Sequence, residues 1–532
     1  MRNIIITIIL LVLAALMSVM YFRKLNSPGQ RPGKVMENIP SNAALIFEYK
    51  NDETFYDIFS NNKLLSNLIG DEHIAELTVL KTRLLDNNLL KNLFEGQSLF
   101  ISVHPQKDTT ANLDFLITTS TRVNMGDEID QLARQKNSDI LIHPMQLAGK
   151  KGYNVFFNSI KRRFYLLLND DNTFSASFSQ PLVEQAAKYH NENHEKFFVQ
   201  LSDQQNSNSI ANLYVNYSQL VPLFDELFKN KNTDIFRSFR LLYAIGAFSL
   251  NYRSDALMFN GISHINNNGP KSYLDIFRYQ QPVVNKLKSI FPASLAYSLN
   301  FAVSNPVSFE TDLLQWQLEA GYNKEKDAIF KRIKTETSIN LAAEFAARLG
   351  NEFAIVTTRY QEKIGLIQLK NGLNLRPFMV NISKMTNDDM GQFNYDKLPF
   401  YLLGDSFSIF RRPYFMIVDN YLIICNSQSG MNEYYKNYTQ GNFLAKTSEY
   451  VRFDNLQAER SNVSFFINFK NAHDILTEAL KPRYARAFAE KGKSWSSYYA
   501  AGYQFTASEK DFYTNFYMRL NLPDTAAVET TQ

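Results

Sequence analysis

Four related stretches organise this chain, and the first reads Ser41-Asn-Ala-Ala-Leu-Ile-Phe-Glu-Tyr49. A close echo is Ala293-Ser-Leu-Ala-Tyr-Ser-Leu-Asn-Phe301. Weaker echoes are Ser209-Ile-Ala-Asn-Leu-Tyr-Val-Asn-Tyr217 and Ser461-Asn-Val-Ser-Phe-Phe-Ile-Asn-Phe469. Each is a short, mostly apolar run that closes on an aromatic residue, which is typical of a β-strand.

The spacing of the closing aromatic residues indicates a duplication. Tyr49 and Phe301 lie 252 positions apart, and so do Tyr217 and Phe469. A proline precedes the first and third stretches at the same offset, at Pro40 and Pro292. A fixed period is the mark of a repeated structural unit. We therefore predict one duplication of a unit of about 250 residues; the alternative is chance similarity among strands of like composition.

Between the repeated strands, helical and strand-like patterns alternate. Residues 55–69 and 71–94 space their apolar side chains as helices, and residues 99–103 and 113–119 read as an antiparallel hairpin. The same order of strand, helices and hairpin returns after residue 295. The predicted fold class is α+β: an N-terminal transmembrane helix, then two tandem, related halves of mostly antiparallel sheet with helices packed on one face.

These patterns also predict domain boundaries. The expected units are a transmembrane signal-anchor at 1–24, a Pro- and Gly-containing tether at 25–38, a first α+β half at 39–290, a second at 291–521, and a disordered tail at 522–532.

The N-terminus carries nineteen residues without a charge, Ile4 to Phe22. As a helix they would extend about 28 Å, close to the hydrocarbon thickness of a bilayer. We predict an uncleaved membrane anchor; a cleaved signal peptide is the alternative. The flanking cations Arg23 and Lys24 favour a cytoplasmic body by simple count, whereas the short N-terminal tail favours export. We expect a single-pass protein of the inner membrane with its large domain in the periplasm.

Composition narrows the possible functions. The chain has 532 residues, and its 56 basic and 52 acidic side chains nearly cancel, so nothing indicates a nucleic-acid partner. The single cysteine, Cys425, excludes an intramolecular disulfide and a thiolate metal site, and we expect it to be buried. The 42 Phe and 29 Tyr favour a β-rich core. A groove for an apolar ligand is the alternative use of these aromatic residues.

Three polar motifs are candidate sites, and none is complete. His190 and His194 are spaced for one helix face, but a transition metal needs a third ligand, and none is indicated. Gly404-Asp405-Ser406 resembles the nucleophile block of the Gly-Asp-Ser hydrolases, but the one histidine that follows, His473, lacks the Asp three residues before it. We interpret this motif as a turn at a strand end. The basic cluster Lys161-Arg162-Arg163 and its echo at Arg411-Arg412 are predicted to be solvated turns. We therefore predict no catalytic, cofactor-binding or metal-binding residue.

The combination of these features resembles a bacterial family of envelope proteins, known as a domain of unknown function, that are anchored by one N-terminal helix. The resemblance rests on the apolar anchor, the tether, the opening Ile39-Pro40-Ser41-Asn42-Ala43 and the paired modules, and spans roughly residues 36 to 521. It implies a membrane-anchored, non-enzymatic binding or scaffold protein, with a membrane contact through residues 4–22 and an envelope protein or lipid as partner. The alternatives are a clamp that binds a lipid between the two halves and, more remotely, a serine hydrolase using Ser406.

Overall fold

The structure is a computed structural model. It describes residues 32–52, 71–105, 114–121, 125–135, 139–169, 171–189, 209–230, 239, 242–267, 269, 271–489 and 497–521. The predicted anchor at 4–22, the predicted helix at 55–69 and the pair His190 and His194 lie outside these ranges. Among the described residues, no helix is both long enough and apolar enough to cross a membrane.

The first half of the chain begins with helix α2 and continues to strand β10. Its elements are α2 (Pro32–Met36), β1 (Leu45–Lys50), α5 (Asp71–Leu80), the π-helical turn η1 (Lys81–Leu85), α6 (Lys91–Phe94), β2 (Ser98–His104), β3 (Asp114–Ser120), α7 (Gly126–Arg134), β4 (Ile140–Leu147), β5 (Lys150–Phe157), β6 (Arg162–Leu168), β7 (Thr173–Ser177), α8 (Gln180–Tyr189), β8 (Ala211–Asn216), α10 (Tyr217–Leu227), β9 (Ala244–Arg253) and β10 (Ala256–Ile265).

A linker of short elements leads into the second half. The linker holds the 3-10 helices η3 (Tyr273–Tyr279) and η4 (Leu287–Ile290) and the strand β11 (Val283–Val284). The second half comprises β12 (Leu295–Ala302), α11 (Pro306–Glu319), α12 (Asn323–Thr337), α13 (Leu341–Arg348), β13 (Leu349–Thr358), β14 (Lys363–Leu369), η5 (Leu373–Leu375), α14 (Arg376–Ile382), β15 (Ser383–Met385), β16 (Met390–Phe393), α15 (Leu398–Leu403), η6 (Asp405–Ile409), β17 (Tyr414–Val418), β18 (Tyr421–Cys425), α16 (Gln428–Thr439), η7 (Leu444–Lys446), α17 (Ser448–Asp454), β19 (Arg460–Ser461), β20 (Val463–Asn468), α18 (Phe469–Ala479), α19 (Pro482–Ala489), β21 (Tyr498–Ser508) and β22 (Asp511–Leu520).

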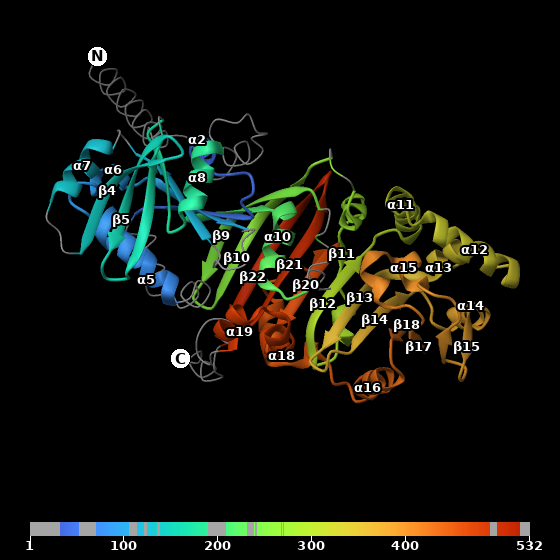
Figure 1. Cartoon of the computed structure of the whole chain (residues 1–532). Coiled ribbons are helices and arrows are strands. Elements are labelled where there is room, and N and C mark those ends of the chain that lie inside the picture. Colours follow the sequence, from blue (N-terminus) through green and yellow to red (C-terminus); the bar gives the residue numbers. More distant parts are fainter. Residues whose placement is uncertain are drawn as a thin grey trace, which may run out of the picture.

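Twenty strands of the described chain form one continuous sheet, in which every pairing is antiparallel (Figure 1). The pairings run β4-β5-β6-β7-β3-β2-β1-β8-β9-β10 through the first half. They continue β22-β21-β20-β12-β13-β14-β18-β17-β16-β15 through the second half. Read outward from the junction, both halves therefore have the same strand order. Strands β1, β8, β12 and β20 coincide with the four repeated stretches of sequence, and β1 and β12 each extend one residue beyond theirs.

The halves are joined edge to edge by their last strands. Strands β10 and β22 pair antiparallel from Ala256 opposite Arg519 to Ser263 opposite Phe512. At the centre, Asn260 lies opposite Asn515, and the Asn260 amide Nδ2 donates a hydrogen bond to the Asn515 Oδ1. The hairpins β9–β10 and β21–β22 have the same register after a shift of 255 positions, under which Asn260 corresponds to Asn515. An approximate two-fold axis therefore passes between these two asparagines.

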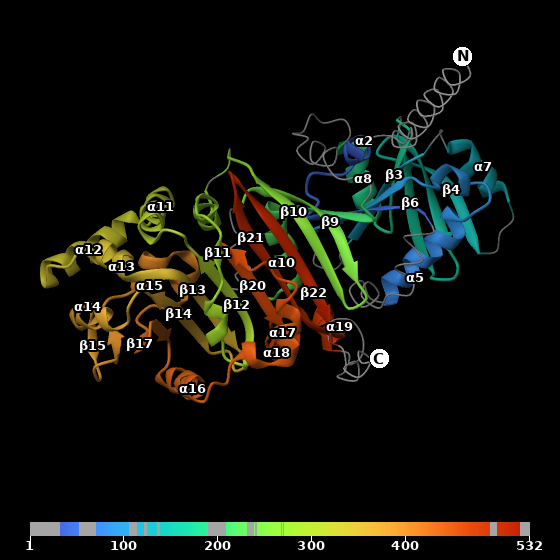
Figure 2. The same cartoon turned by 180° about the vertical axis from the view of Figure 1, so that it is seen from behind.

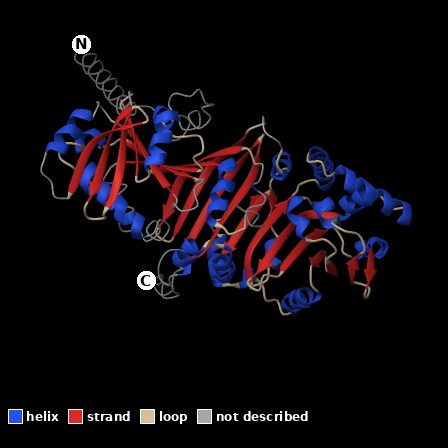
Figure 3. Ribbon diagram, in the orientation of Figure 1, coloured by secondary structure: helices blue, strands red, loops and turns tan. Residues whose placement is uncertain are grey.

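Helices cover both faces of the sheet, because alternate residues on the strands enter different apolar clusters. On β20, Phe465 belongs to the cluster under α10, α11, α15 and α18, whereas its neighbour Phe466 belongs to the cluster under α16 and α17. We call these sides the α18 face and the α17 face. Figure 1 shows α10, α18 and α19 in front of the sheet, and Figure 2 shows α17 on the opposite side. Figure 3 shows the single sheet with helices on both sides.

The predicted fold class is corrected on these points. The protein is α+β, but it is one continuous antiparallel sheet with helices on both faces, and no membrane-spanning helix is found among the described residues. The prediction of helices on one face was wrong because strands such as β20, with Phe465 on one face and Phe466 on the other, are buried on both sides, so their apolar residues do not alternate with exposed polar ones.

Three local predictions also need correction. The helix predicted over 71–94 is broken into α5, η1 and α6. Strand β7 was missed, because its residues Thr173–Ser177 are mostly small and polar although all are buried. The run Leu398–Leu403 is helix α15, so the Gly404 turn joins two helical segments rather than ending a strand. The predicted hairpin at 99–103 and 113–119 and the buried Cys425 are confirmed.

A buried carboxylate holds the linker between the halves against the second half. Glu352, on β13, accepts hydrogen bonds from the backbone N–H of Lys286 at 2.7 Å and of Leu287 at 3.1 Å, and from Asn300 Nδ2 at 3.3 Å. Burial raises the pKa of the Glu352 carboxyl, and the two backbone donors oppose that shift. These bonds occupy the otherwise unsatisfied N–H groups at the start of η4.

We expect Glu352→Ala to lower the free energy of unfolding by about 2 to 3 kcal/mol, because it leaves buried donors without an acceptor. Urea denaturation measures the loss. The control is Glu344→Ala, which removes an exposed ion pair with Arg348 on α13 and should cost no more than about 0.5 kcal/mol. Equal losses in the two variants would show that Glu352 does not hold the linker.

Candidate functional site

The serine predicted as a remote nucleophile, Ser406, lies in the helical turn η6 and is nearly buried. The histidine that the chemistry would require, His473, is on α18, where its Nδ1 lies 3.1 Å from the Asp474 carboxylate. A serine hydrolase needs a base within hydrogen-bond reach of its nucleophile, and here Ser406 and His473 lie on different elements, η6 and α18.

A serine, a histidine and an asparagine do meet elsewhere in the fold. Ser102 Oγ lies 2.8 Å from His104 Nε2, and His104 Nδ1 lies 2.9 Å from Asn42 Oδ1. Because the Asn42 oxygen can only accept, Nδ1 carries the proton and Nε2 accepts from Ser102. Both Ser102 and His104 are fully buried, on the face where β1 and β2 pack against α2. Since no substrate can reach this serine, the arrangement is part of the core rather than an active site.

Metal ligands are not gathered anywhere in the described part of the chain: no group of three His, Cys, Asp or Glu side chains is close enough to hold an ion. The basic cluster predicted as a solvated turn is partly structural. Arg162 begins β6, forms an ion pair with Glu76 and lies 4.5 Å from the centre of the Phe178 ring. These two contacts give Arg162 a structural role.

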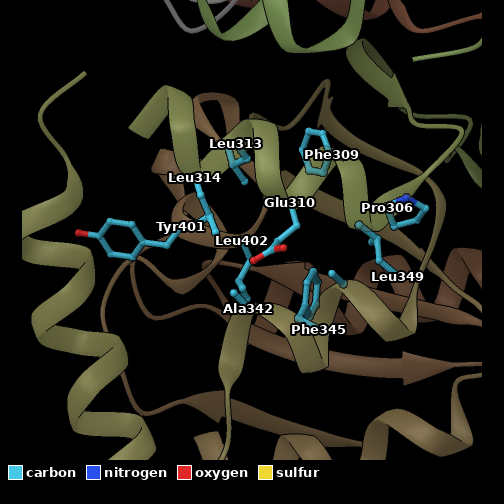
Figure 4. A pocket seen from close by; sticks show the side chains of 11 residues that line it. Pro306, Phe309, Glu310, Leu313, Leu314, Ala342, Phe345, Leu349, Tyr401 and Leu402 are labelled. Atoms are coloured by element: carbon cyan, nitrogen blue, oxygen red, sulfur yellow. The ribbon is translucent and has the colours of Figure 1, made fainter. Parts of the chain in front are cut away.

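A small hollow lies between α11, α13 and α15, with about 290 Å³ of empty space that includes open solvent (Figure 4). Its walls are apolar, and Glu310 is the one acidic side chain that lines it. Burial raises the pKa of the Glu310 carboxyl, and the charge of Lys326 opposes that shift. Pockets that enclose a small ligand usually measure about 300 to 1,000 Å³. The comparable volume of this hollow is only about 10 Å³, so it does not enclose a lipid chain.

The most ordered polar feature of the molecule is a straight row of side chains across the centre of the sheet. Each member lies directly opposite the next one on the neighbouring strand. We call this set the polar row, and its members are Glu48, Asn212, Ser249, Asn260, Asn515, Gln504, Ser464 and Asn300. It crosses the eight strands from β1 to β12 on the α17 face and is symmetric about the axis between Asn260 and Asn515.

Hydrogen bonds connect much of the polar row and attach its ends to the rest of the fold. Asn212 Nδ2 donates to Glu48 Oε2 at 3.0 Å, and Ser249 Oγ donates to Asn212 Oδ1 at 3.2 Å. At the other end, Asn300 bonds to Glu352, as described above. Ser249, Asn260 and Ser464 are half-buried, whereas the other five members, including Asn515 at the centre, are buried. Beside the axis, the row is therefore accessible on the first-half side, at Ser249 and Asn260.

Around this centre, neutral polar groups and exposed apolar groups lie together. We call the residues Ser249, Asn251, Asn260, Ile262 and Tyr513 the central strip; they lie on β9, β10 and β22. Asn251 is exposed and donates through Nδ2 to Asn260 Oδ1 at 3.0 Å. Ile262 and Tyr513 face each other across the junction, and each is 42% exposed. Figure 2 shows these long strands in view beside α17.

Charged groups mark the two ends of the central strip without entering it. At one end His264 Nδ1 lies 2.8 Å from Asp511 Oδ2, and at the other Arg519 Nη2 lies 2.7 Å from Asp255 Oδ2. None of the five strip residues is charged. The strip can therefore offer hydrogen bonds and apolar contacts, but it has no group suited to general acid–base catalysis.

Sequence reasoning did not find the polar row or the central strip. Strand patterns alone do not fix which polar residues on neighbouring strands lie opposite one another. The one available signal was the recurrence of members at the same places in the repeated stretches, Glu48 with Asn300 and Asn212 with Ser464.

Comparisons with known proteins add little. No protein-family model matches the chain, and no curated protein is similar to it. Among solved structures, the chain described as "Structure of crystal form III of TP0453" is similar at 8% sequence identity with a TM-score of 0.23, over 47% of this chain and 89% of that chain. A likeness at that level supports no conclusion about fold or function.

Proposed function

We propose that this is a non-enzymatic binding or scaffold protein of the bacterial envelope. In this proposal residues 4–22 attach it to the inner membrane, its folded body lies in the periplasm, and the central strip contacts a partner protein. The observation that carries the proposal is the central strip itself: neutral hydrogen-bonding groups and two exposed apolar side chains, placed on the axis that relates the halves. The apolar N-terminus and the family resemblance support the envelope location.

The burial of the arrangement of Ser102, His104 and Asn42, which keeps substrates away from this serine, favours binding over an enzymatic role. The lipid-clamp alternative has less support. The two halves are joined by the pairing of β10 with β22 and do not face each other across a cleft. The hollow in Figure 4 lies within the second half.

The test is affinity capture from solubilised membranes with the full chain as bait. We expect the same partner protein to be recovered repeatedly with the native chain and to be reduced about thirtyfold by Tyr513→Ala, because an exposed tyrosine at the centre of an interface can contribute about 2 kcal/mol. The matched control is Tyr360→Ala, which truncates a tyrosine that is 61% exposed on the turn between β13 and β14.

Two measurements make that experiment decisive. Circular dichroism and the urea midpoint of both variants should match the native chain, since truncating an exposed tyrosine changes stability by about 0.5 kcal/mol or less. A bait that repeatedly comes down alone argues against a binding function. A partner that Tyr513→Ala and Tyr360→Ala retain equally well would place the binding surface away from the central strip.

A further inference from the structure

One member of the polar row already holds a stretch of peptide backbone. Gln504 on β21 donates from Nε2 to the carbonyl oxygen of Ala458 at 2.9 Å and accepts from the N–H of Ala458 at 2.8 Å. Next to it, Thr506 Oγ1 donates to the Arg460 carbonyl oxygen at 3.3 Å. The segment that contains Ala458 and Arg460 therefore lies across β21 through side-chain to backbone bonds, and it buries Gln504 completely.

The amide groups continue from that intramolecular contact into the central strip. Asn515 lies directly opposite Gln504, Asn260 lies opposite Asn515, and Asn251 donates to Asn260. The approximate two-fold axis relates Asn260 to Asn515 and Ser249 to Gln504. On strands β9 and β10, which belong to the first half, Asn251 is exposed and Asn260 is half-buried. The surface that binds backbone at Gln504 thus extends onto strands where its polar groups are accessible.

We propose that the central strip binds an extended, uncharged segment of a partner polypeptide. This inference rests on the function proposed above and specifies the chemistry of its partner. Asn251, Asn260 and Ser249 would bond to the backbone of the segment as Gln504 bonds to Ala458. Tyr513 and Ile262 would contact an apolar side chain of the segment. Three strands span about 14 Å, so about four extended residues would cross the strip.

Other ligands fit the strip less well. Nucleic acid needs cations along its path, and none of the five residues is charged. A folded protein partner commonly covers about 800 Å² on each side, far more than three strands with two exposed apolar side chains provide. A neutral oligosaccharide would use the same amides and the same tyrosine. The contact between Gln504 and Ala458 favours a peptide, because there a member of the polar row already binds the backbone of a peptide segment.

Recognition through backbone groups has a specific consequence. Amide to backbone hydrogen bonds do not read side chains, so binding should tolerate changes in sequence but not the loss of backbone N–H groups. The contact with Tyr513 and Ile262 should still require an apolar residue at one position. We therefore expect weak binding that survives scrambling of the peptide.

The experiment uses the full chain and fluorescence anisotropy with a labelled peptide. The probe copies residues 455–462 of this chain, with Gln in place of Glu459 and Arg460 so that it is uncharged. A scrambled version and a backbone N-methylated version are measured beside it, together with cellohexaose and chitohexaose by calorimetry. A displayed pool of random twelve-residue peptides, selected on the full chain, covers the case in which this probe is a poor ligand.

We expect the probe and its scrambled version to bind within about threefold of each other and the N-methylated version to bind at least tenfold more weakly. Asn251→Ala should weaken binding about three- to tenfold, the effect of one lost hydrogen bond. Tyr513→Ala should weaken it at least tenfold. The matched controls Asn381→Ala, on the exposed side of α14, and Tyr360→Ala should leave it unchanged.

Two results would overturn the inference while leaving the proposed binding function intact. The first is oligosaccharide binding that the strip substitutions abolish. The second is a captured partner that depends on Tyr513 while neither the probe nor any selected peptide binds the strip. If no partner is captured and no peptide binds, the proposed function falls together with this inference. Equal binding of the N-methylated peptide would show that the backbone is not what the strip recognises.

Discussion

Lowering the pH from 7 to 4 is expected to reduce the free energy of unfolding by about 3 kcal/mol through His104 alone. Burial lowers the pKa of His104 from 6.5 to about 3, so the folded protein keeps the imidazole neutral throughout this range. The unfolded chain takes up a proton below its ordinary pKa of 6.5. The contribution of neutral His104 to the free energy of unfolding is therefore fully present above pH 6.5 and is lost as the pH falls toward 3.

The measurement is urea denaturation at several pH values, with a variant that removes only the titration. His104→Thr is the natural choice, because Thr358 occupies the equivalent position in the second half, 254 residues later. The native chain should lose about 1.4 kcal/mol per pH unit more than the variant between pH 6 and pH 4. Parallel pH profiles for the two proteins would mean that His104 is accessible to protons in the folded state.

Replacing Phe353 by alanine is expected to cost about 3 to 5 kcal/mol of unfolding free energy. Its ring is completely buried on β13 at the centre of an aromatic cluster. The ring centroids of Phe301 and Phe309 lie 5.4 Å away, and that of Phe277, from the linker helix η3, lies 6.4 Å away. The substitution removes contacts that join the second half to the linker and leaves a cavity that a rigid sheet cannot close.

Urea midpoints measure this loss against two controls. Leu99→Ala truncates the equivalent buried residue of the first half and should cost about 2 to 5 kcal/mol. Tyr360→Ala truncates an exposed ring two residues beyond the end of the same strand and should cost about 0.5 kcal/mol or less. A loss below about 1 kcal/mol for Phe353→Ala would show that the cluster repacks easily and does not hold the linker.

The two outer strands of the sheet limit unwanted pairing with other chains. The outermost strand of the first half, β4, contains Pro144, which has no N–H to donate. The outermost strand of the second half, β15, is three residues long. Short strands and prolines discourage edge-to-edge association. A partner is therefore expected to use the face of the sheet rather than its edges.

Most strands could be predicted from the sequence because local patterns determine them. The period of 252 residues predicts that β1 and β12 are equivalent, as are β8 and β20, and their observed pairings match. The antiparallel hairpin of β2 and β3 was also predicted from the local alternation of apolar and polar residues. A short apolar run fits either a strand or a helix. Leu398–Leu403 was therefore predicted as the end of a strand, although it forms helix α15.

Strand order, the covering of both faces and the candidate site depended on the tertiary structure. Phe465 and Phe466 are consecutive apolar residues, and only packing against α18 on one side and α17 on the other explains why both are buried. The polar row depends on register: a shift of one residue in β10 would turn Asn260 to the opposite face and break the row. Register is a property of long-range pairing, and no single strand contains it. The residues of the proposed binding surface are therefore chosen by the fold, although every one of them is visible in the sequence.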